Sequence, residues 1–318
     1  MLYNKGNVRT PLLSSIGGRT KYTNSVEYVL SQTYASEDGE IPNISETQSL
    51  TAPEASYITR NQATNVTQIF QDSVAISYAK MSNMGTLSGA NIAGQEANPL
   101  SELDFQIARK MNKLGRQIEK TFIQGTYNKA TKDTEVNKTR GLNEALVSNV
   151  IQANGKALDI WMLNDLLIKM KENGADITNL VAWLDTVTIN QLNGSAVENG
   201  LTIVPATRNE NGINVRTVEL PSGIVTIANG EFIPAGTAFL LNLNELAPVE
   251  QLVPGKGNFF LEPLAKTGAG EKYQIFGQIG LDYGAEHLHG KITGLATTFT
   301  KPVGKKVVVV NETETESV

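Results

Sequence analysis

The sequence predicts an α+β protein, and two observations support that prediction. Residues 98–125, NPLSELDFQIARKMNKLGRQIEKTFIQG, have the apolar spacing of a long amphipathic helix. Most segments around this helix alternate apolar and polar residues over short distances, between glycines and polar turns, as half-buried strands do. We therefore expect a strand-rich chain in which one long helix packs against sheets.

The chain begins with two segments that lack a core-forming period. Residues 1–25 are polar and rich in glycine, serine and threonine, which predicts an extended arm. A short strand, 26–30, follows. Residues 36–65 are polar and contain two prolines, and an unstructured loop of that length is uncommon inside a compact domain. We expect a projecting hairpin or a segment that packs on something outside its own domain. Residues 66–81 then alternate as a strand does, with Val74, Ile76 and Tyr78 on one face.

The long helix has its own start and stop signals. Asn98 can cap it, Pro99 suits the first helical position, and Gly125 is a natural stop. The interior Gly115 should cost about 1 kcal/mol relative to alanine. Phe105 lies opposite the apolar stripe, so we expect a second contacted surface. The stripe itself consists of Leu103, Ile107, Met111, Leu114, Ile118 and Phe122.

The helix also carries a run of positive charge, which has two interpretations. It could face an acidic partner or packaged nucleic acid. It could also be a solvated face with cations favoured by the helix dipole, which is the commoner case. The only acidic residue over this span is Glu119. The basic residues are Arg109, Lys110, Lys113, Arg116 and Lys120.

Residues 157–250 predict a compact α+β region. A helix is expected over 158–174, capped by Asp159 and ended by Gly174, and a shorter one from Asp185 to 194. The expected strands are 180–184, 201–205, 213–220, 223–230 and 237–243. Beyond residue 258 the pattern is again that of strands, at 259–264, 271–284 and 286–297, before a four-valine run and an acidic tail.

Composition excludes several classes of function. The 318 residues carry a net charge of −5, which argues against a dedicated nucleic-acid binder. There is no cysteine, so disulfides, thiolate metal sites and a cysteine nucleophile are excluded. Residues 1–20 lack the apolar core of a signal peptide. No stretch approaches the roughly 18 apolar residues that span a bilayer, so we expect no membrane partner and a soluble subunit.

Motifs for catalysis or ligand binding are scarce. His287 and His289 would share one face of a strand and could begin a metal site, but no third ligand is placed nearby, so structural histidines are the better interpretation. No G-x-S-x-G elbow accompanies them. The segment 36–40, SEDGE, lacks the ligand order of a calcium loop. A pair of carboxylates for glycoside hydrolysis stays open as an alternative. Trp161 and Trp183 both lie in apolar runs, however, and offer little surface on which a sugar could stack. We therefore predict no catalytic, cofactor-binding or metal residues and no cofactor.

The order of these segments, and the amino-acid sequence of several of them, resemble those of one known protein family. The matching stretches are 65–85, 102–128, 139–142 (TRGL) and 286–295 (EHLHGKITGL). They resemble the major capsid, or major head, proteins of tailed bacteriophages with the Hong Kong 97-type fold. The resemblance implies a virion structural protein that self-assembles, in the host cytoplasm, into hexamers and pentamers of an icosahedral shell around double-stranded DNA.

The resemblance also implies a division of the chain. Residues 1–25 would be the N-terminal arm, and 26–81 the extended loop that reaches neighbouring subunits. Residues 82–149, with the spine helix 98–125, would form the peripheral domain, together with the return strands and tail of 251–318. Residues 150–250 would form the axial domain. Expected partners are further copies of the chain, a separate scaffolding protein, a portal, and DNA held by weak non-specific contact.

Three other functions remain open at this point. An encapsulin-like bacterial compartment would use the same fold to package an enzyme. A hydrolase would have to use His287 or His289. A sheath or surface-layer protein would form helical or planar arrays instead of closed shells.

Overall fold

The computed structural model describes residues 9–34, 41–52, 57–82, 102–198, 209–210, 213–214 and 216–299. The chain forms two compact units, each built from two separated stretches. Unit 1 comprises Met1–Ser148 and Asn242–His289, and unit 2 comprises Asn149–Leu241 and Gly290–Val318. The chain therefore leaves unit 1 and returns to it.

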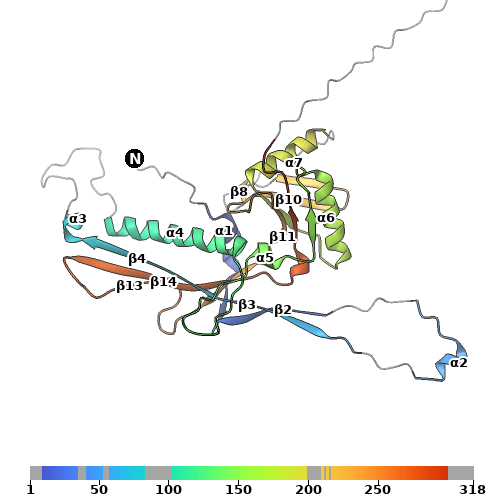
Figure 1. Cartoon of the computed structure of the whole chain (residues 1–318), viewed down its shortest axis with the longest axis horizontal. Coiled ribbons are helices and arrows are strands. Elements are labelled where there is room, and N and C mark those ends of the chain that lie inside the picture. Colours follow the sequence, from blue (N-terminus) through green and yellow to red (C-terminus); the bar gives the residue numbers. More distant parts are fainter. Residues whose placement is uncertain are drawn as a thin grey trace, which may run out of the picture. The chain divides into compact units, whose positions relative to one another are not determined.

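Unit 1 is built on a five-stranded sheet in which β14 is the central strand (Figure 1). β14 pairs antiparallel with β4, β12 and β13, and β1 adds to β12 in parallel. The β4–β14 register runs from Ser77 opposite Gly270 to Gln68 opposite Ile279. The strands are β1 (Lys21–Thr23), β4 (Gln68–Ser77), β12 (Ala247–Gln251), β13 (Phe260–Pro263) and β14 (Gly270–Asp282).

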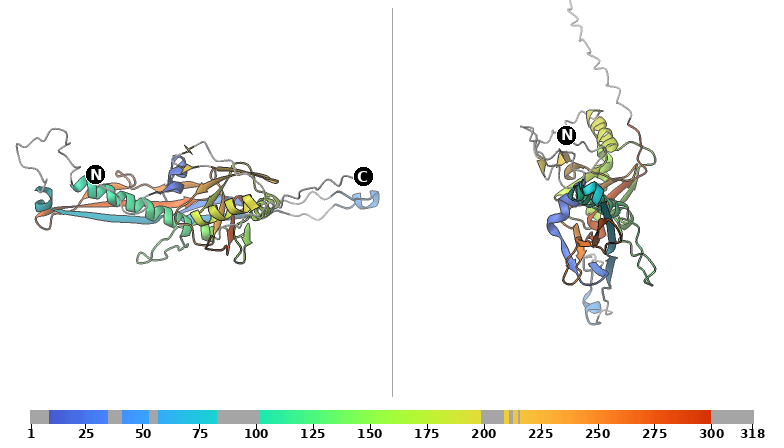
Figure 2. Two further views of the ribbon diagram at one scale, coloured as in Figure 1. Left: turned by 90° about the horizontal axis from the view of Figure 1, so that it is seen from above. Right: turned by 90° about the vertical axis from the view of Figure 1, so that its left-hand side faces the viewer.

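The long helix α4 (Glu102–Gln124) lies along the β4–β14 pair, as both Figure 1 and Figure 2 show. Its apolar stripe is buried only in the C-terminal half, at Leu114, Ile118 and Phe122. Met111, predicted to be buried, is 40% exposed. The proposed cap at residues 98–99 lies outside the described residues.

A charged cluster joins α4 to β4. The Asp72 carboxylate of β4 accepts hydrogen bonds from Lys110 Nζ at 2.7 Å and from Lys113 Nζ at 2.8 Å. Burial raises the pKa of Asp72, but these two bonds and one from the Ser73 backbone N–H outweigh it and lower the pKa to about 2. Two of the five basic residues on α4 are therefore committed to the sheet.

The N-terminal segment differs from the extended arm that the sequence predicts. Residues 9–23 form α1 (Pro11–Ile16), the 3-10 turn η1 (Gly17–Arg19) and β1. Leu12 and Ile16, one helical turn apart, are fully buried. The Leu13 N–H at the start of α1 donates to the buried Glu119 carboxylate of α4, which satisfies an amide that a helix N-terminus leaves open. The first eight residues lie outside the described part.

Unit 1 also contains a hairpin and three short helices. The hairpin strands pair antiparallel, with a register shift between Val29 and Ser31. The predicted loop 26–81 is thus a hairpin only to Val66, because β4 belongs to the main sheet. The hairpin strands are β2 (Glu27–Tyr34) and β3 (Arg60–Val66), and the short helices are α2 (Glu46–Ser49), α3 (Tyr78–Ser82) and α5 (Leu142–Ala145).

Unit 2 is a six-stranded sheet in the order β5-β15-β11-β6-β10-β9, accompanied by two helices (Figure 1). Buried leucines and Met170 of α6 contact this sheet at β5 and β15, and Trp183 of β6 is also buried. A two-stranded ribbon, β7 (Asn209–Glu210) with β8 (Ile213–Asn214), is separate. The predicted strand 201–205 lies outside the described residues. The other elements are β5 (Val150–Gln152), α6 (Ile160–Glu172), β6 (Leu180–Leu184), α7 (Thr186–Glu198), β9 (Arg216–Leu220), β10 (Gly223–Asn229), β11 (Ala238–Asn242) and β15 (Gly290–Thr293).

The last predicted strand, 286–297, is wrong in its first half. Residues Glu286–Leu288 form the 3-10 turn η2, and only β15 is extended. The Glu286 carboxylate accepts from the backbone N–H groups of Val147 and Ser148, which favours a turn over a strand. β15 pairs with β5 and β11, so it belongs to the sheet of unit 2 and not to the strands that return beside α4.

His289 is a buried residue of unit 1. Its Nδ1 accepts from the Asn242 N–H at 3.1 Å, and its Nε2 therefore carries the proton and donates to the Tyr283 carbonyl at 2.8 Å. Burial lowers the pKa of His289 to about 4, from an ordinary value of 6.5. A protonated ring would turn the Nδ1 acceptor into a second donor facing an N–H.

We expect the stability of the unassembled subunit to depend on His289 below neutral pH. The unfolded chain takes up a proton near pH 6.5 and the folded chain only near pH 4, so stability is complete above 6.5 and falls as the pH drops through this window. The total loss should be about 3 kcal/mol. Urea denaturation between pH 7.5 and 4 measures it. His289→Gln should flatten this slope, and an unchanged slope in that variant would contradict the assignment.

We expect the Asp72 cluster to hold α4 on β4. Asp72→Asn keeps the shape but leaves Lys110 and Lys113 facing each other without a counter-charge, and should lower the free energy of unfolding by about 1–2 kcal/mol. The matched control is Glu262→Gln, which breaks the Lys256–Glu262 pair, whose side chains are both more than 40% exposed. Equal effects of the two variants in chemical denaturation would show that the Asp72 cluster is an ordinary surface pair.

Candidate interaction surfaces

The apex of the β2–β3 hairpin is an exposed apolar surface. Its largest apolar side chains are almost fully exposed, with Ile41 at 92%, Leu50 at 85% and Tyr57 at 89%. The helix α2 is nevertheless locally ordered by a capping box, in which Ser45 Oγ accepts from the Gln48 N–H and the Gln48 amide oxygen accepts from the Ser45 N–H. A preformed turn with unburied apolar side chains is typical of a docking element.

A second apolar surface is a groove in unit 1 of about 360 Å³, beside Gly115 of α4. The 40% exposed Met111 lines this groove, which explains why it departs from the predicted buried stripe. Among the described residues, a Cβ at Gly115 would meet only Thr10 Cγ2, at 3.9 Å. The described part of unit 1 therefore has room for an alanine at position 115. The glycine makes the helix about 1 kcal/mol less stable than an alanine would.

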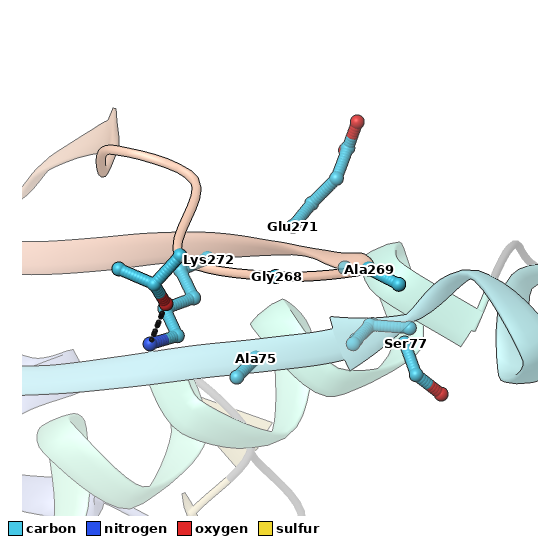
Figure 3. A pocket seen from close by; sticks show the side chains of 9 residues that line it. Ala75, Ser77, Gly268, Ala269, Glu271 and Lys272 are labelled. Atoms are coloured by element: carbon cyan, nitrogen blue, oxygen red, sulfur yellow. Dashed lines mark hydrogen bonds between the residues drawn. The ribbon is translucent and has the colours of Figure 1, made fainter.

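A smaller hollow of about 240 Å³ lies where the β13–β14 turn meets the end of β4 (Figure 3). Gly268 and Ala269 form the turn, and Ala75 of β4 adds another small side chain. Lys272 donates to Thr267 Oγ1 at 2.8 Å, while Glu271 points away from β4. The hollow results from small side chains, and the lysine next to it already has a hydrogen-bond partner.

The basic residues of α4 occupy one face of the helix. At about 100° per residue they fall within an arc of about 120°, opposite Met111 and Ile118. Arg109 stacks on Phe105, with Cζ 5.1 Å from the ring centroid, so Phe105 has a partner within its own helix. Lys120 is exposed near the C-terminal end of α4. Arg109 and Lys120 are thus exposed in the subunit, whereas Lys110 and Lys113 are bound by Asp72.

Unit 2 exposes apolar side chains on one face of α6. Trp161 is 51% exposed and Ile168, two turns further on, is 41% exposed. Trp183, in contrast, is buried. The two tryptophans therefore have different roles, although both lie in apolar runs.

The residues considered for catalysis do not form a site. The two histidines do not share a strand face, because His287 lies in η2 and His289 is buried with both ring nitrogens in contact with backbone groups. Within the described ranges no group of three or more His, Cys, Asp or Glu residues could hold a metal. Among the helices of those ranges, none has both the length and the apolar composition needed to cross a bilayer.

Sequence reasoning missed two features of these surfaces. The first is α2, although Ser45 and Gln48 have the S-x-x-Q spacing of a capping box. The second is the groove, for which the one sequence signal was a glycine in the middle of an otherwise strong helix. Its other walls come from α1, β12 and β14, and no local pattern brings those elements together.

Comparison with known proteins gives a family and a fold. The sequence model of the family described as SU10 major capsid protein matches residues 1–296. A search of curated protein sequences gave no match. Among solved structures, the capsid asymmetric unit of cyanophage A-1(L) is similar with a TM-score of 0.65 and 13% identity, covering 93% of this chain and 95% of that chain.

Two further structures share the fold. A chain of the structure of Microbacterium phage Oxtober96 has a TM-score of 0.60 and 11% identity, over 92% of this chain and 93% of that one. The holo-SrpI encapsulin complex from Synechococcus elongatus PCC 7942 has a TM-score of 0.59 and 12% identity, over 95% of both chains. The predicted Hong Kong 97-type fold class is thus confirmed, and the family match covers nearly the whole sequence. The chain belongs to the SU10 major capsid protein family.

Proposed function

We propose that copies of this chain assemble into hexamers and pentamers that form the icosahedral head shell of a tailed bacteriophage. The observation that carries the proposal is the family match over residues 1–296 of a chain with a phage capsid fold. Exposed apolar surfaces on the hairpin apex and on α6 supply the contact area that such an assembly requires. The protein is a structural one and not an enzyme, because its family is that of a capsid protein.

The proposed roles of the segments follow the division made from the sequence, with the bounds adjusted to the two units. Residues 26–66 contribute the hairpin that reaches a neighbouring copy, and residues 149–241 together with β15 form the axial contacts within a capsomer. Residues 82–148 and 242–289 form the peripheral part, with α4 as its spine. For the arm, 1–25, the proposal is narrower, because residues 9–23 form α1, η1 and β1 and pack on their own unit.

The remaining partners are part of the same proposal. A separate scaffolding protein directs assembly in the host cytoplasm, a portal occupies one vertex, and the finished shell is part of the virion. Double-stranded DNA is held by weak, non-specific contact, which suits a chain with a net charge of −5 and one basic helix face.

A second function with the same fold is an encapsulin-like compartment that packages an enzyme. The similarity to the SrpI encapsulin complex favours it, since that structure matches over 95% of both chains. The family match favours the phage shell, which is therefore the leading proposal.

We expect the full chain, expressed with and without a scaffolding partner, to form closed shells with visible capsomers in negative-stain microscopy. Monomers or small discrete oligomers under every condition would contradict the proposal. Helical or planar arrays would indicate a sheath or layer protein. Particles that co-purify with a stoichiometric protein cargo and without DNA would support the compartment.

We expect the exposed cations of α4 to contribute to DNA retention. Arg109→Gln combined with Lys120→Gln should lower the nucleic-acid content of purified particles, measured by the ratio of absorbance at 260 and 280 nm, without changing shell yield. Each lost phosphate contact weakens binding and reduces its salt dependence. Lys132→Gln with Lys171→Gln, two exposed lysines elsewhere, is the matched control. An equal loss in both pairs would show that only net charge matters.

A further inference from the structure

The groove beside Gly115 is apolar but contains one carboxylate. Glu250 of β12 is the charged side chain in the lining, and it is half-buried. Within the part of the chain that the structure describes, its carboxylate has neither a hydrogen bond nor an ion pair. A carboxylate next to apolar surface and without a counter-charge is unfavourable, so a cation is favoured here. The apolar lining is Leu13, Met111, Leu114, Ile118, Phe259 and Ile279.

The cations on the elements around the groove already have partners. Arg19 of η1 donates to a backbone carbonyl and to the side chain of Asn244. Lys21 of β1 pairs with Asp282 at 2.6 Å. Two lysines of α4 are held by Asp72, as described above. None of these four side chains therefore supplies the counter-charge for the groove.

Two glycines clear space around the groove. Phe259 has a left-handed backbone, with φ of +50°, and a Cβ at Gly277 would come within 2.5 Å of its ring, so this glycine makes room for the aromatic wall. On the α4 side, Thr10 is the one described residue that comes within 4 Å of a Cβ added to Gly115. The backbone of another segment can therefore approach α4 closely at this position.

The segment that precedes α1 starts beside this groove. Thr10 Cγ2 lies 3.9 Å from the position that a Cβ of Gly115 would take. The groove runs along α4 from Met111 to Ile118, which is about 10 Å at 1.5 Å per residue. Eight extended residues span up to about 28 Å. Residues 1–8 are therefore long enough to lie along the whole groove.

Residues 1–8, MLYNKGNV, have a composition that suits this surface. Leu2, Tyr3 and Val8 are apolar, and Lys5 is the basic residue of a segment without acidic ones. A tether of so few residues keeps the segment at an effective concentration in the millimolar range, so a weak contact suffices to hold it.

Other segments of unit 1 have the opposite charge. Residues 36–58, around the hairpin apex, contain five acidic residues and no lysine or arginine. Residues 83–101, which precede α4, contain Glu96 and no basic residue. Both would bring negative charge to Glu250, whereas residues 1–8 bring positive charge. Charge complementarity therefore favours the N-terminal segment as the occupant of the groove.

We propose that residues 1–8 form a strap that closes the groove beside Gly115 in their own copy of the chain. Lys5 pairs with the Glu250 carboxylate, and Tyr3 covers Met111, which is otherwise 40% exposed. The strap thereby removes from the single subunit an apolar surface that favours non-specific association. The inference concerns contacts within one copy, so it does not depend on the shell proposed above.

Disulfide formation tests the strap, because the chain contains no cysteine. Tyr3→Cys is combined with Met111→Cys in the full chain, which is treated with oxidised glutathione and run under denaturing, non-reducing conditions. A disulfide requires Cα atoms within about 7 Å, so a seated strap should give a monomer-sized band without free thiols. The matched control is Tyr3→Cys with Asn112→Cys, since Asn112 is exposed on another face of the same turn of α4. The Met111 pair should close about tenfold faster than the control pair.

Charge reversal tests the ion pair within the strap. Lys5→Glu should slow the Met111 disulfide about tenfold, because repulsion replaces a charge-assisted contact. Adding Glu250→Lys to Lys5→Glu should restore the rate, while the Asn112 disulfide should respond to neither change. Should Glu250→Lys impair folding, Glu250→Gln gives the same readout. It should slow the Met111 disulfide as much as Lys5→Gln does, and the two together should slow it no further.

Three results would overturn the strap. The first is an equal rate for the Met111 and Asn112 pairs. The second is a Met111 disulfide that joins two chains, because the occupant would then come from another copy. The third is a rate that Lys5→Glu leaves unchanged. Shell formation by the wild-type chain is scored separately by microscopy, so a failure of the strap leaves the proposed function intact, and an absence of shells leaves this measurement unaffected.

Discussion

The pairing of β4 with β14 is the interaction on which the rest of unit 1 depends. Ten residue pairs join strands that lie about 200 positions apart in the chain. β14 also pairs with β12 and β13, and β12 in turn pairs with β1. α4 rests on the β4–β14 pair with Leu114, Ile118 and Phe122, and Asp72 of β4 binds two of its lysines. Without this pairing the helix, the N-terminal segment and the groove would have no common support.

Elements with a strong local period could be predicted from the sequence. The helices α4 and α6 and the strands β6, β10, β11 and β14 lie where apolar spacing indicated, because each is buried on one face or throughout in its own unit. α7 begins after Asp185, whose carboxylate accepts from the Thr188 N–H, as the capping signal implied. Local sequence patterns therefore predict a helix or strand correctly where its apolar spacing matches the surface that it buries.

The predictions that were wrong concern segments whose structure depends on contacts with residues far away in the sequence. Residues 9–23 looked like a free arm because their apolar residues are few, yet Leu12 and Ile16 are buried against partners more than 90 positions away. The segment at His289 looked like a strand, but the Glu286 carboxylate binds the amides of Val147 and Ser148 and favours a turn. Of the interaction surfaces, only the unusual length of the polar loop was visible beforehand. The groove depends on four elements that the sequence alone does not bring together.

Three solved structures share this fold although their sequences are only 11–13% identical to this chain. A fold of this kind needs apolar residues at the right period far more than it needs particular side chains. Exposed apolar surfaces have a further constraint, since side chains such as Ile41, Leu50 and Tyr57 favour non-specific association. The five acidic residues of the same loop oppose it, because two such loops repel each other.

The distance between β4 and β14 along the chain also sets an order of events during synthesis. β4 is made about 200 residues before its partner strand, which is complete only at Asp282. Local hairpins such as β2–β3 form in microseconds, whereas closure over some 200 residues waits for the ribosome, which adds about 5–20 residues per second. Ile279 and Phe259 are needed for the groove, so the hairpin apex exists before any groove on the same nascent chain. The subunit thus acquires its two surfaces one after the other, and the second appears only after Ile279 has been added to the chain.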